Sequence, residues 1–255
     1  MRISACETAR SERLGRCTAA TAYAGGMCGT YGFDEVRASR AGQRRVSFTA
    51  VDEAACSERL GQWAAALGGT AQITRRKARN LNPLVHEVAG ERRVDPGWWW
   101  LWLNGAPAPF SAFNSRDDAL MRSWRVPFQR RAILPATWYR EQGARFGFAG
   151  EPFGIAAITS TVPQRDGSPL VTYSMVTRAG VGEAASVLSS RGEARMPLIL
   201  PESMHDEWLA ADRPGDPELV ARAVASSESL SRAIVRAEPE PGAARRDRAP
   251  ALFEL

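Results

Sequence analysis

The residue pair Met27-Cys28 carries the most reactive chemistry that the sequence offers. A methionine before a small residue is typical of a translation start, so we expect the working chain to begin at Met27, or to lose residues 1–26, and to present Cys28 as its N-terminus. The amine of an N-terminal cysteine can condense with an aldehyde, and its thiol can close the imine into a five-membered ring. An α-amino group has a pKa of about 7.8, against about 10.4 for lysine, so more of it is neutral and nucleophilic. The alternative is that Cys28 is a small buried apolar residue at the start of a strand.

Lysine is nearly absent from the chain. Of the 33 lysine and arginine residues, only Lys77 is a lysine. We therefore expect an imine with an aldehyde to form at the chain terminus. The net charge of +5 is carried by arginines, whose guanidinium groups suit phosphate contacts.

A tryptophan cluster at residues 98–102 is the second feature. Four tryptophans in five residues alternate across both faces of a strand, so we expect some of Trp99, Trp100 and Trp102 to be exposed and to stack on bases. The alternative is a strand buried on both faces. In the segment that follows, Asn114 can offer an amide to a substrate oxygen and Arg116 can hold a phosphate in its fork.

Two further segments carry charged candidates. Glu141 follows Trp138 and Tyr139, and desolvation by these rings could raise the pKa of its carboxyl so that it acts as a general acid. Alternatively, it is a solvated glutamate beside Arg140. Arg195 precedes a short apolar strand and is a candidate phosphate contact, with an ordinary surface arginine as the alternative.

The pattern of apolar residues predicts an α+β fold: a β-rich single domain with peripheral helices. Residues 45–51 run as a strand into a helix, with Thr49 and Asp52 placed like a capping box, and Gly68-Gly69 ends that helix. A helix from Pro201 and another capped by Asp216-Pro217 are expected near the C-terminus. The remaining apolar segments predict strands around 84–89, 98–103, 131–136, 153–162, 170–177 and 197–200.

Composition divides the chain into three parts and excludes several classes of protein. Residues 1–26 look like a disordered leader, 27–236 form the domain, and 237–255 are a flexible tail. The four cysteines form no C-x-x-C pair and the two histidines lie far apart, so we expect reduced thiols, no metal site and no cofactor. There is no signal-peptide core and no run near the ~20 apolar residues of a membrane span, so we expect a cytoplasmic protein. A monomer is the default expectation.

Taken in order, the motifs resemble those of the SRAP family, the SOS response-associated peptidases that process abasic sites. The family pattern runs M-C-G-R, Y-N-x-A-P, W-G-L, F-N-A-R, L-I-P-A-x-G-x-Y-E-W and H-x-R-M-P-V-I-L. The resemblance covers roughly residues 27–235. This sequence has M-C-G-T at 27–30, R-N-L-N-P at 79–83, W-L-W-L at 100–103, F-N-S-R at 113–116, I-L-P-A-T-W-Y-R-E at 133–141 and A-R-M-P-L-I-L at 194–200.

The resemblance implies an SRAP-like fold with barrel-like curved sheets and a function in DNA repair. Cys28 would trap the ring-opened aldehyde of an abasic site in single-stranded DNA as a thiazolidine, a covalent protein–DNA link. Asn114 would orient the sugar and Glu141 would be the acid. A self-processing peptidase (hydrolase) step and a weak lyase activity are also implied. The DNA-binding residues would be Arg116, Arg195, Trp99, Trp100, Trp102 and Asn80.

Two departures from the family pattern keep a second function open. Glu193 stands where the family has a histidine that is thought to assist proton transfer, so Glu193 takes that catalytic position here. Arg140 precedes Glu141 where the family favours an aromatic residue, and its charge would keep the acid ionised. The alternative function is a divergent single-stranded DNA-binding module that has lost the covalent chemistry. A general cysteine protease is disfavoured because Cys28 has no recognisable histidine partner.

Overall fold

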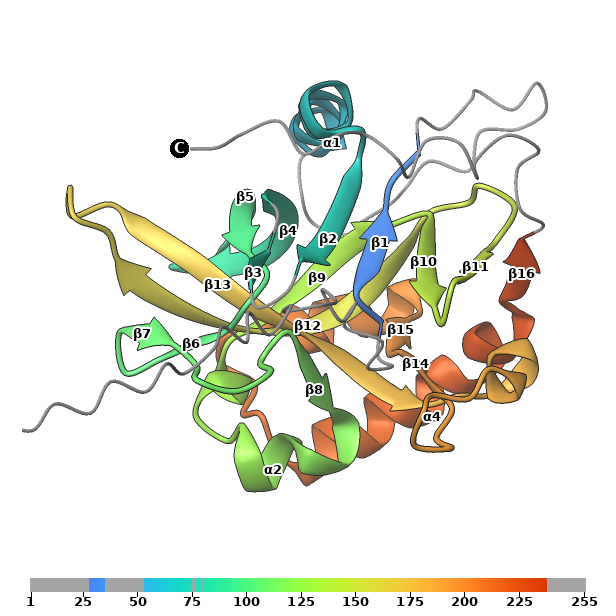
Figure 1. Cartoon of the computed structure of the whole chain (residues 1–255). Helices are drawn as coiled ribbons and strands as arrows, with labels where there is room; N and C mark the ends of the chain where they lie inside the picture. The colour runs from blue at the N-terminus through green and yellow to red at the C-terminus, as the bar shows by residue number, and fades with distance from the viewer. Residues whose placement is uncertain (1–27, 35–52, 75–76, 79, 238–255) are drawn as a thin grey trace, which may run out of the picture.

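Five strands close into a β-barrel at the centre of the computed structural model (Figure 1). An odd number of strands cannot close with every neighbour antiparallel, so one pair must be parallel, and here it is β5 with β13. The barrel order is β13-β5-β4-β9-β12, and β12 pairs again with β13. The barrel strands are β4 (Leu81–Val88), β5 (Glu91–Trp98), β9 (Arg131–Ala136), β12 (Phe153–Pro163) and β13 (Pro169–Ala179).

A second, six-stranded sheet stands beside the barrel and carries the N-terminal strand. Its order is β16-β11-β10-β1-β2-β3, with β1 antiparallel to both β2 and β10. The structure describes residues 28–34, 53–74, 77–78 and 80–237. The strands of this sheet are β1 (Thr30–Gly32), β2 (Thr70–Thr74), β3 (Lys77–Ala78), β10 (Trp138–Glu141), β11 (Ala144–Gly147) and β16 (Val235–Ala237).

Short strands and helices complete the described part of the chain. The short strands are β6 (Trp102–Leu103), β7 (Ala106–Pro107), β8 (Asn114–Arg116), β14 (Arg195–Pro197) and β15 (Ile199–Leu200). The α-helices are α1 (Glu53–Leu67), α2 (Leu120–Ser123), α3 (His205–Leu209) and α4 (Pro217–Ala233). Single 3₁₀ turns are η1 (Asp117–Ala119), η2 (Pro127–Gln129), η3 (Gly182–Ser186) and η4 (Glu202–Met204).

Strand β9 shows why the barrel strands read as continuous apolar runs. All six of its residues are buried, because one face lines the barrel and α3 packs on the strand from outside. The indole Nε1 of Trp208 on α3 donates to the carbonyl of Ala132 at 3.0 Å. The guanidinium of Arg131 donates to carbonyls that include those of Phe128 and Trp208, and its burial lowers its pKa to about 10.

The expected fold class is confirmed: the protein is β-rich, with a barrel and peripheral helices. Helix α1 ends as expected at Gly68 and Gly69, whose φ angles are 65° and 56°. Asp216 caps α4 by accepting from the backbone N–H of Leu219 at 2.8 Å. None of the helices in the described part of the chain has the length and apolar character to cross a membrane.

One expected strand is corrected, and several expected segments lie outside the described residues. The expected strand 98–103 is interrupted, because β5 ends at Trp98 and β6 begins only at Trp102. The leader 1–26, the segment 45–51 with Thr49 and Asp52, and nearly all of the tail lie outside the described residues.

Candidate active site

Cys28 and Glu141 meet beside the two central strands of the six-stranded sheet, β1 and β10. Cys28 lies just before β1 and Glu141 is the last residue of β10, the strand that pairs with β1. The thiol of Cys28 donates to Oε2 of Glu141 at 2.7 Å, and both side chains are buried. A nucleophile and an acid from distant parts of the sequence therefore share one hydrogen bond.

Burial sets the protonation state of this pair. Burial is the largest cause that raises the pKa of the Glu141 carboxyl, while the Cys28 thiol and nearby Arg195 pull it down more weakly. Burial also raises the pKa of the Cys28 thiol well above its ordinary value, and the Glu141 carboxyl raises it further. The thiol is therefore held as S–H, and the carboxyl is biased toward the neutral acid, the direction that the sequence predicts for Glu141.

Asn114 joins the pair through the backbone of Cys28. Its Nδ2 donates to the carbonyl oxygen of Cys28 at 2.8 Å. The amide oxygen Oδ1 of Asn114 is buried and has no hydrogen-bond partner in the described structure. The amide donor is thus already engaged, and the acceptor is the atom that remains available to a substrate hydroxyl or to an N-terminal amine.

Strand β1 is fixed to the barrel at Tyr31, three residues after Cys28. The Tyr31 and Tyr173 hydroxyls lie 2.7 Å apart, and Asn82 Nδ2 donates to the Tyr173 hydroxyl at 3.0 Å. Gly32 lies under the Trp138 indole, where any Cβ would collide with the ring. These contacts hold the start of β1, and therefore Cys28, against β10.

Arg195 is the buried cation close enough to act on Cys28 and Glu141. It is buried, so the alternative of an ordinary surface arginine is wrong. Its Nη2 donates to the carbonyl of Thr177 at 2.6 Å and to Oδ1 of Asp117 at 3.2 Å, while its Nε has no partner in the described structure. Its positive charge lowers the pKa of both Cys28 and Glu141, so Arg195 is the cation of the site.

Arg116 and Glu193 form an exposed ion pair rather than a part of the thiol–carboxyl cluster. Arg116 Nη1 lies 3.1 Å from Oε2 of Glu193, and its Nη2 lies 2.7 Å from Oδ2 of Asp118. Glu193 is exposed and binds Arg116, not Cys28 or Glu141. The structure thus does not bring Glu193 into contact with the groups whose protons it was expected to move.

Some of Trp99, Trp100 and Trp102 were expected to be exposed and to stack on bases, and for Trp99 and Trp100 the structure does not support this. Trp99 and Trp100 are buried, and their indole N–H groups donate to the carbonyls of Phe113 and Ala108 at 2.7 and 3.0 Å. Trp99 also stacks on Tyr173, with 6.1 Å between ring centroids. Because Phe113 precedes Asn114, Trp99 positions the site from within the core instead of stacking on bases. Trp102 is half-buried.

Asn80 is half-buried and serves a local turn. Its Nδ2 donates to Oδ1 of Asn82 at 2.7 Å. Asn82 in turn binds the Tyr173 hydroxyl, which contacts Tyr31. Asn80 is therefore linked to β1 through buried side chains, and no contact joins it directly to Cys28.

Sequence reasoning missed Tyr139 and misjudged Arg140. The Tyr139 hydroxyl is buried without a hydrogen-bond partner in the described structure, and burial raises its pKa, with smaller contributions from Cys28 and Glu141. Alternation along β10 could have placed Tyr139 on the same face as Glu141. The same alternation directs Arg140 to the other face. Arg195, not Arg140, is the cation that acts on the Glu141 carboxyl.

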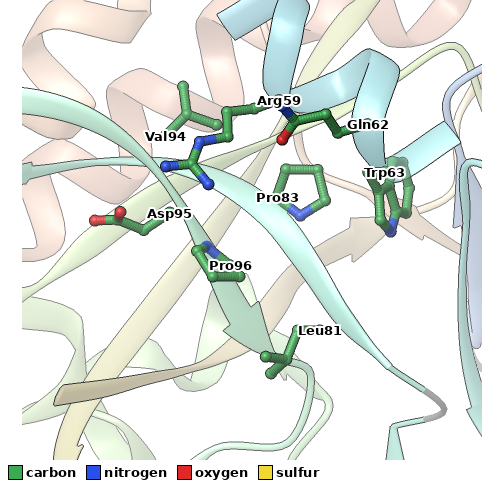
Figure 2. A pocket seen from close by; sticks show the side chains of 8 residues that line it. All are labelled: Arg59, Gln62, Trp63, Leu81, Pro83, Val94, Asp95 and Pro96. Atoms are coloured by element: carbon green, nitrogen blue, oxygen red, sulfur yellow. The ribbon is translucent and has the colours of Figure 1, made fainter. Parts of the chain in front are cut away.

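A shallow pocket lies elsewhere, between α1 and the β4–β5 hairpin (Figure 2). None of the residues expected to do chemistry lines it. Among the described residues, no group of three or more His, Cys, Asp or Glu side chains is placed to hold a metal ion. The residues that line the pocket are Arg59, Gln62, Trp63, Leu81, Pro83, Val94, Asp95 and Pro96.

Two of the solved structures that are similar to this chain come from Bordetella bronchiseptica. A phage-related protein from Bordetella bronchiseptica has a TM-score of 0.50 and 15% identity, covering 83% of this chain and 95% of that one. A second protein from the same organism has a TM-score of 0.48 and 15% identity, covering 75% and 92%. At 15% identity, the likeness to the phage-related protein concerns the fold alone. No curated protein matches the chain in sequence.

The family comparison covers the barrel and the second sheet together. The model of the SOS response associated peptidase (SRAP) family matches residues 27–237. The match includes Cys28, Asn114 and Glu141, the three residues that the structure brings together. This chain therefore belongs to the SRAP family.

Proposed function

We propose that this protein traps abasic sites in single-stranded DNA as a covalent thiazolidine through an N-terminal Cys28. Membership of the SRAP family associates the chain with the SOS response and with DNA damage. The observation that carries the finer proposal is the convergence of Cys28, Glu141 and Asn114 within one set of buried hydrogen bonds. The proposal requires a chain that begins at Cys28, because an amide nitrogen cannot form an imine.

The first half of the reaction uses the amine. In the ring-opened abasic sugar, the lone pair of the Cys28 nitrogen attacks the aldehyde carbon and one proton moves from nitrogen to the carbonyl oxygen, which gives a carbinolamine. Loss of water from the protonated carbinolamine gives an iminium ion, whose nitrogen keeps its remaining proton. The neutral Glu141 carboxyl supplies the proton that makes hydroxide leave as water.

The second half uses the thiol. The Cys28 sulfur attacks the iminium carbon, and the π electrons of the C=N bond move to nitrogen, which is left as a neutral secondary amine. The thiol proton passes to the Glu141 carboxylate formed in the previous step, across the 2.7 Å contact. The sum is aldehyde plus aminothiol giving thiazolidine plus water, with Glu141 returned to its acid form.

Asn114 orients the nucleophile in this scheme. Its bond to the Cys28 carbonyl fixes the backbone from which both the amine and the thiol project. Its free Oδ1 can accept a hydrogen bond from the amine or from a sugar hydroxyl. The self-processing peptidase step and a weak lyase activity through the imine belong to the same proposal and draw on the same residues.

One observation favours the alternative, a single-stranded DNA-binding module without covalent chemistry. Glu193 occupies the family's histidine position and is bound to Arg116, so the protonating group of that position is missing. In this case, Arg116 and Arg195 would contact phosphates and Cys28 would be a buried structural residue. Both functions place the protein on DNA in the cytoplasm.

Single-stranded DNA with one abasic site separates the two functions. Protein that starts at Cys28 is expected to give a heat-stable, slower-migrating band that Cys28→Ser loses. The exposed-surface variant Glu202→Gln is the control and is expected to retain the band. Binding to the same DNA without a heat-stable band would favour the binding module.

A further inference from the structure

We propose that Arg140 binds a phosphate of the DNA strand at the outer face of the β1–β10 pair, beside the candidate active site. This inference deepens the proposed function and rests on it for the identity of the ligand, single-stranded DNA. It assigns to Arg140 a role in DNA binding, whereas from the sequence the charge of Arg140 was expected to keep the Glu141 carboxyl ionised.

The strand register places Arg140 on a basic row across the sheet. Arg140 lies directly opposite Thr30 on β1 and Arg145 on β11. Directly opposed residues point to the same face of a sheet, and residues two apart on one strand do so as well. Trp138 therefore shares this face, while Glu141 and Tyr139 point to the other.

Charge balance distinguishes Arg140 from the arginines expected to bind phosphate. Arg116 is bound by two carboxylates, those of Asp118 and Glu193. Arg195 is bound to Asp117, and Arg145 is bound to Asp34. In the described parts of the chain, Arg140 has no such carboxylate partner. Unlike Arg116, Arg195 and Arg145, it can therefore meet an incoming anion without displacing an internal carboxylate.

The Arg140 side chain is also held by an aromatic contact, and one of its hydrogen-bond donors is unpaired in the described structure. Its guanidinium carbon lies 5.7 Å from the centroid of the Trp138 ring, a contact that limits its rotamers. Its Nε is buried and has no hydrogen-bond partner in the described structure. A phosphate oxygen on that edge of the guanidinium would satisfy this donor. The planar fork of arginine suits two parallel bonds to one phosphate.

The position fits a DNA strand that passes the start of β1 and the end of β10. Cys28 enters β1 where β10 ends at Glu141, and Arg140 precedes Glu141 on the opposite face. An abasic sugar at Cys28 and Glu141 would therefore have a neighbouring phosphate on the Arg140 face. Trp138 is itself buried, so its contribution is to hold the arginine.

The test measures equilibrium binding to single-stranded DNA that lacks an abasic site, so that covalent chemistry plays no part. Arg140→Gln is expected to bind about tenfold more weakly at low salt, because one charge-assisted contact is lost. It should also reduce the slope of log K against log salt by about 0.7, the value for one phosphate on a single strand. Arg140→Lys keeps the charge and is expected to keep the slope.

The control is Arg165→Gln, an exposed arginine in the β12–β13 turn, which is expected to match the wild-type protein. An Arg140→Gln protein that binds like Arg165→Gln would overturn the inference, as would weaker binding with an unchanged salt slope. A reduced slope without any crosslink in the abasic-site assay would support Arg140 and contradict the covalent function. Crosslinking by the wild-type protein together with an unaffected salt slope in Arg140→Gln would support the covalent function and contradict the Arg140 contact. A wild-type protein that does not bind this DNA would overturn both the Arg140 contact and the covalent function.

Discussion

The thiol of Cys28 and the carboxyl of Glu141 lie 2.7 Å apart, although 113 residues separate them in the sequence. The contact is made because β1 and β10 pair so that Cys28 enters one strand where the other ends. With both groups buried, a proton can pass between them without entering bulk water. This relationship is the basis of the predictions that follow.

Glu141→Gln should slow crosslinking strongly without preventing DNA binding. Glutamine has nearly the same shape but cannot donate a proton as an acid, so we expect the single-turnover rate to fall by about 10²- to 10⁴-fold. Quench-flow or gel-based time courses with abasic single-stranded DNA measure this rate. The exposed Glu151→Gln serves as the matched control and should react like wild type. An unchanged rate in Glu141→Gln would show that Glu141 is not the acid.

Asn114→Ala should slow crosslinking by less. The substitution removes the hydrogen bond to the Cys28 carbonyl, whose contribution of about 1 kcal/mol corresponds to roughly five- to tenfold in rate. The rates of the variant and of the wild-type protein are both measured at saturating DNA, so that a change in DNA affinity does not alter the comparison of rates. Asn114→Asp removes the same donor and should be at least as slow. Full activity in both variants would contradict the orienting role.

Glu193→Gln should bind single-stranded DNA more tightly. Arg116 would lose one of its two carboxylate partners and become more available to a phosphate. Since an exposed ion pair contributes about 0.2 to 1 kcal/mol, we expect up to roughly fivefold higher affinity. Fluorescence anisotropy at low salt measures the change, with exposed Glu202→Gln as the control for net charge. Weaker binding by Glu193→Gln would show that Glu193 supports the interface instead.

The raised pKa of Glu141 predicts how stability depends on pH. The folded protein holds this proton more tightly than the unfolded chain, in which the carboxyl has a pKa of about 4.3. The contribution of Glu141 to stability therefore falls as the pH rises from that value to the raised one, and is constant above it.

Glutamine at this position does not titrate. The free energy of unfolding of Glu141→Gln, relative to wild type, should therefore increase between about pH 4 and about pH 7. Denaturant unfolding at the two pH values measures the difference. A difference that stays constant or decreases would mean that the pKa of Glu141 is not raised in the folded protein.

The sequence predicts the elements of this fold better than their pairing. Gly68-Gly69 and Asp216-Pro217 act locally, so the end of α1 and the start of α4 follow from neighbouring residues. The shortest strands do not follow from neighbouring residues. Thr30–Gly32 and Asn114–Arg116, for example, are extended only through pairing with distant strands. Such long-range pairing carries no local periodicity.

The candidate site shows the same division. Motif order led to Cys28, Asn114 and Glu141, and the structure brings these three together. The tryptophans were misjudged because alternation along a strand shows which faces side chains take, but not that a barrel buries Trp99 and Trp100. Arg140 was misjudged because adjacency in sequence to Glu141 was taken as proximity of charge.

Intact-mass spectrometry of the reaction with abasic single-stranded DNA tests the central claim most directly. Protein that begins at Cys28 should give one species whose mass is the sum of protein and DNA minus one water, with the link mapped to residue 28. Cys28→Ser, and a protein that retains Met27, should not give this stable species. Absence of the adduct from the Cys28-starting protein, or an adduct mapped to Lys77, would contradict the account.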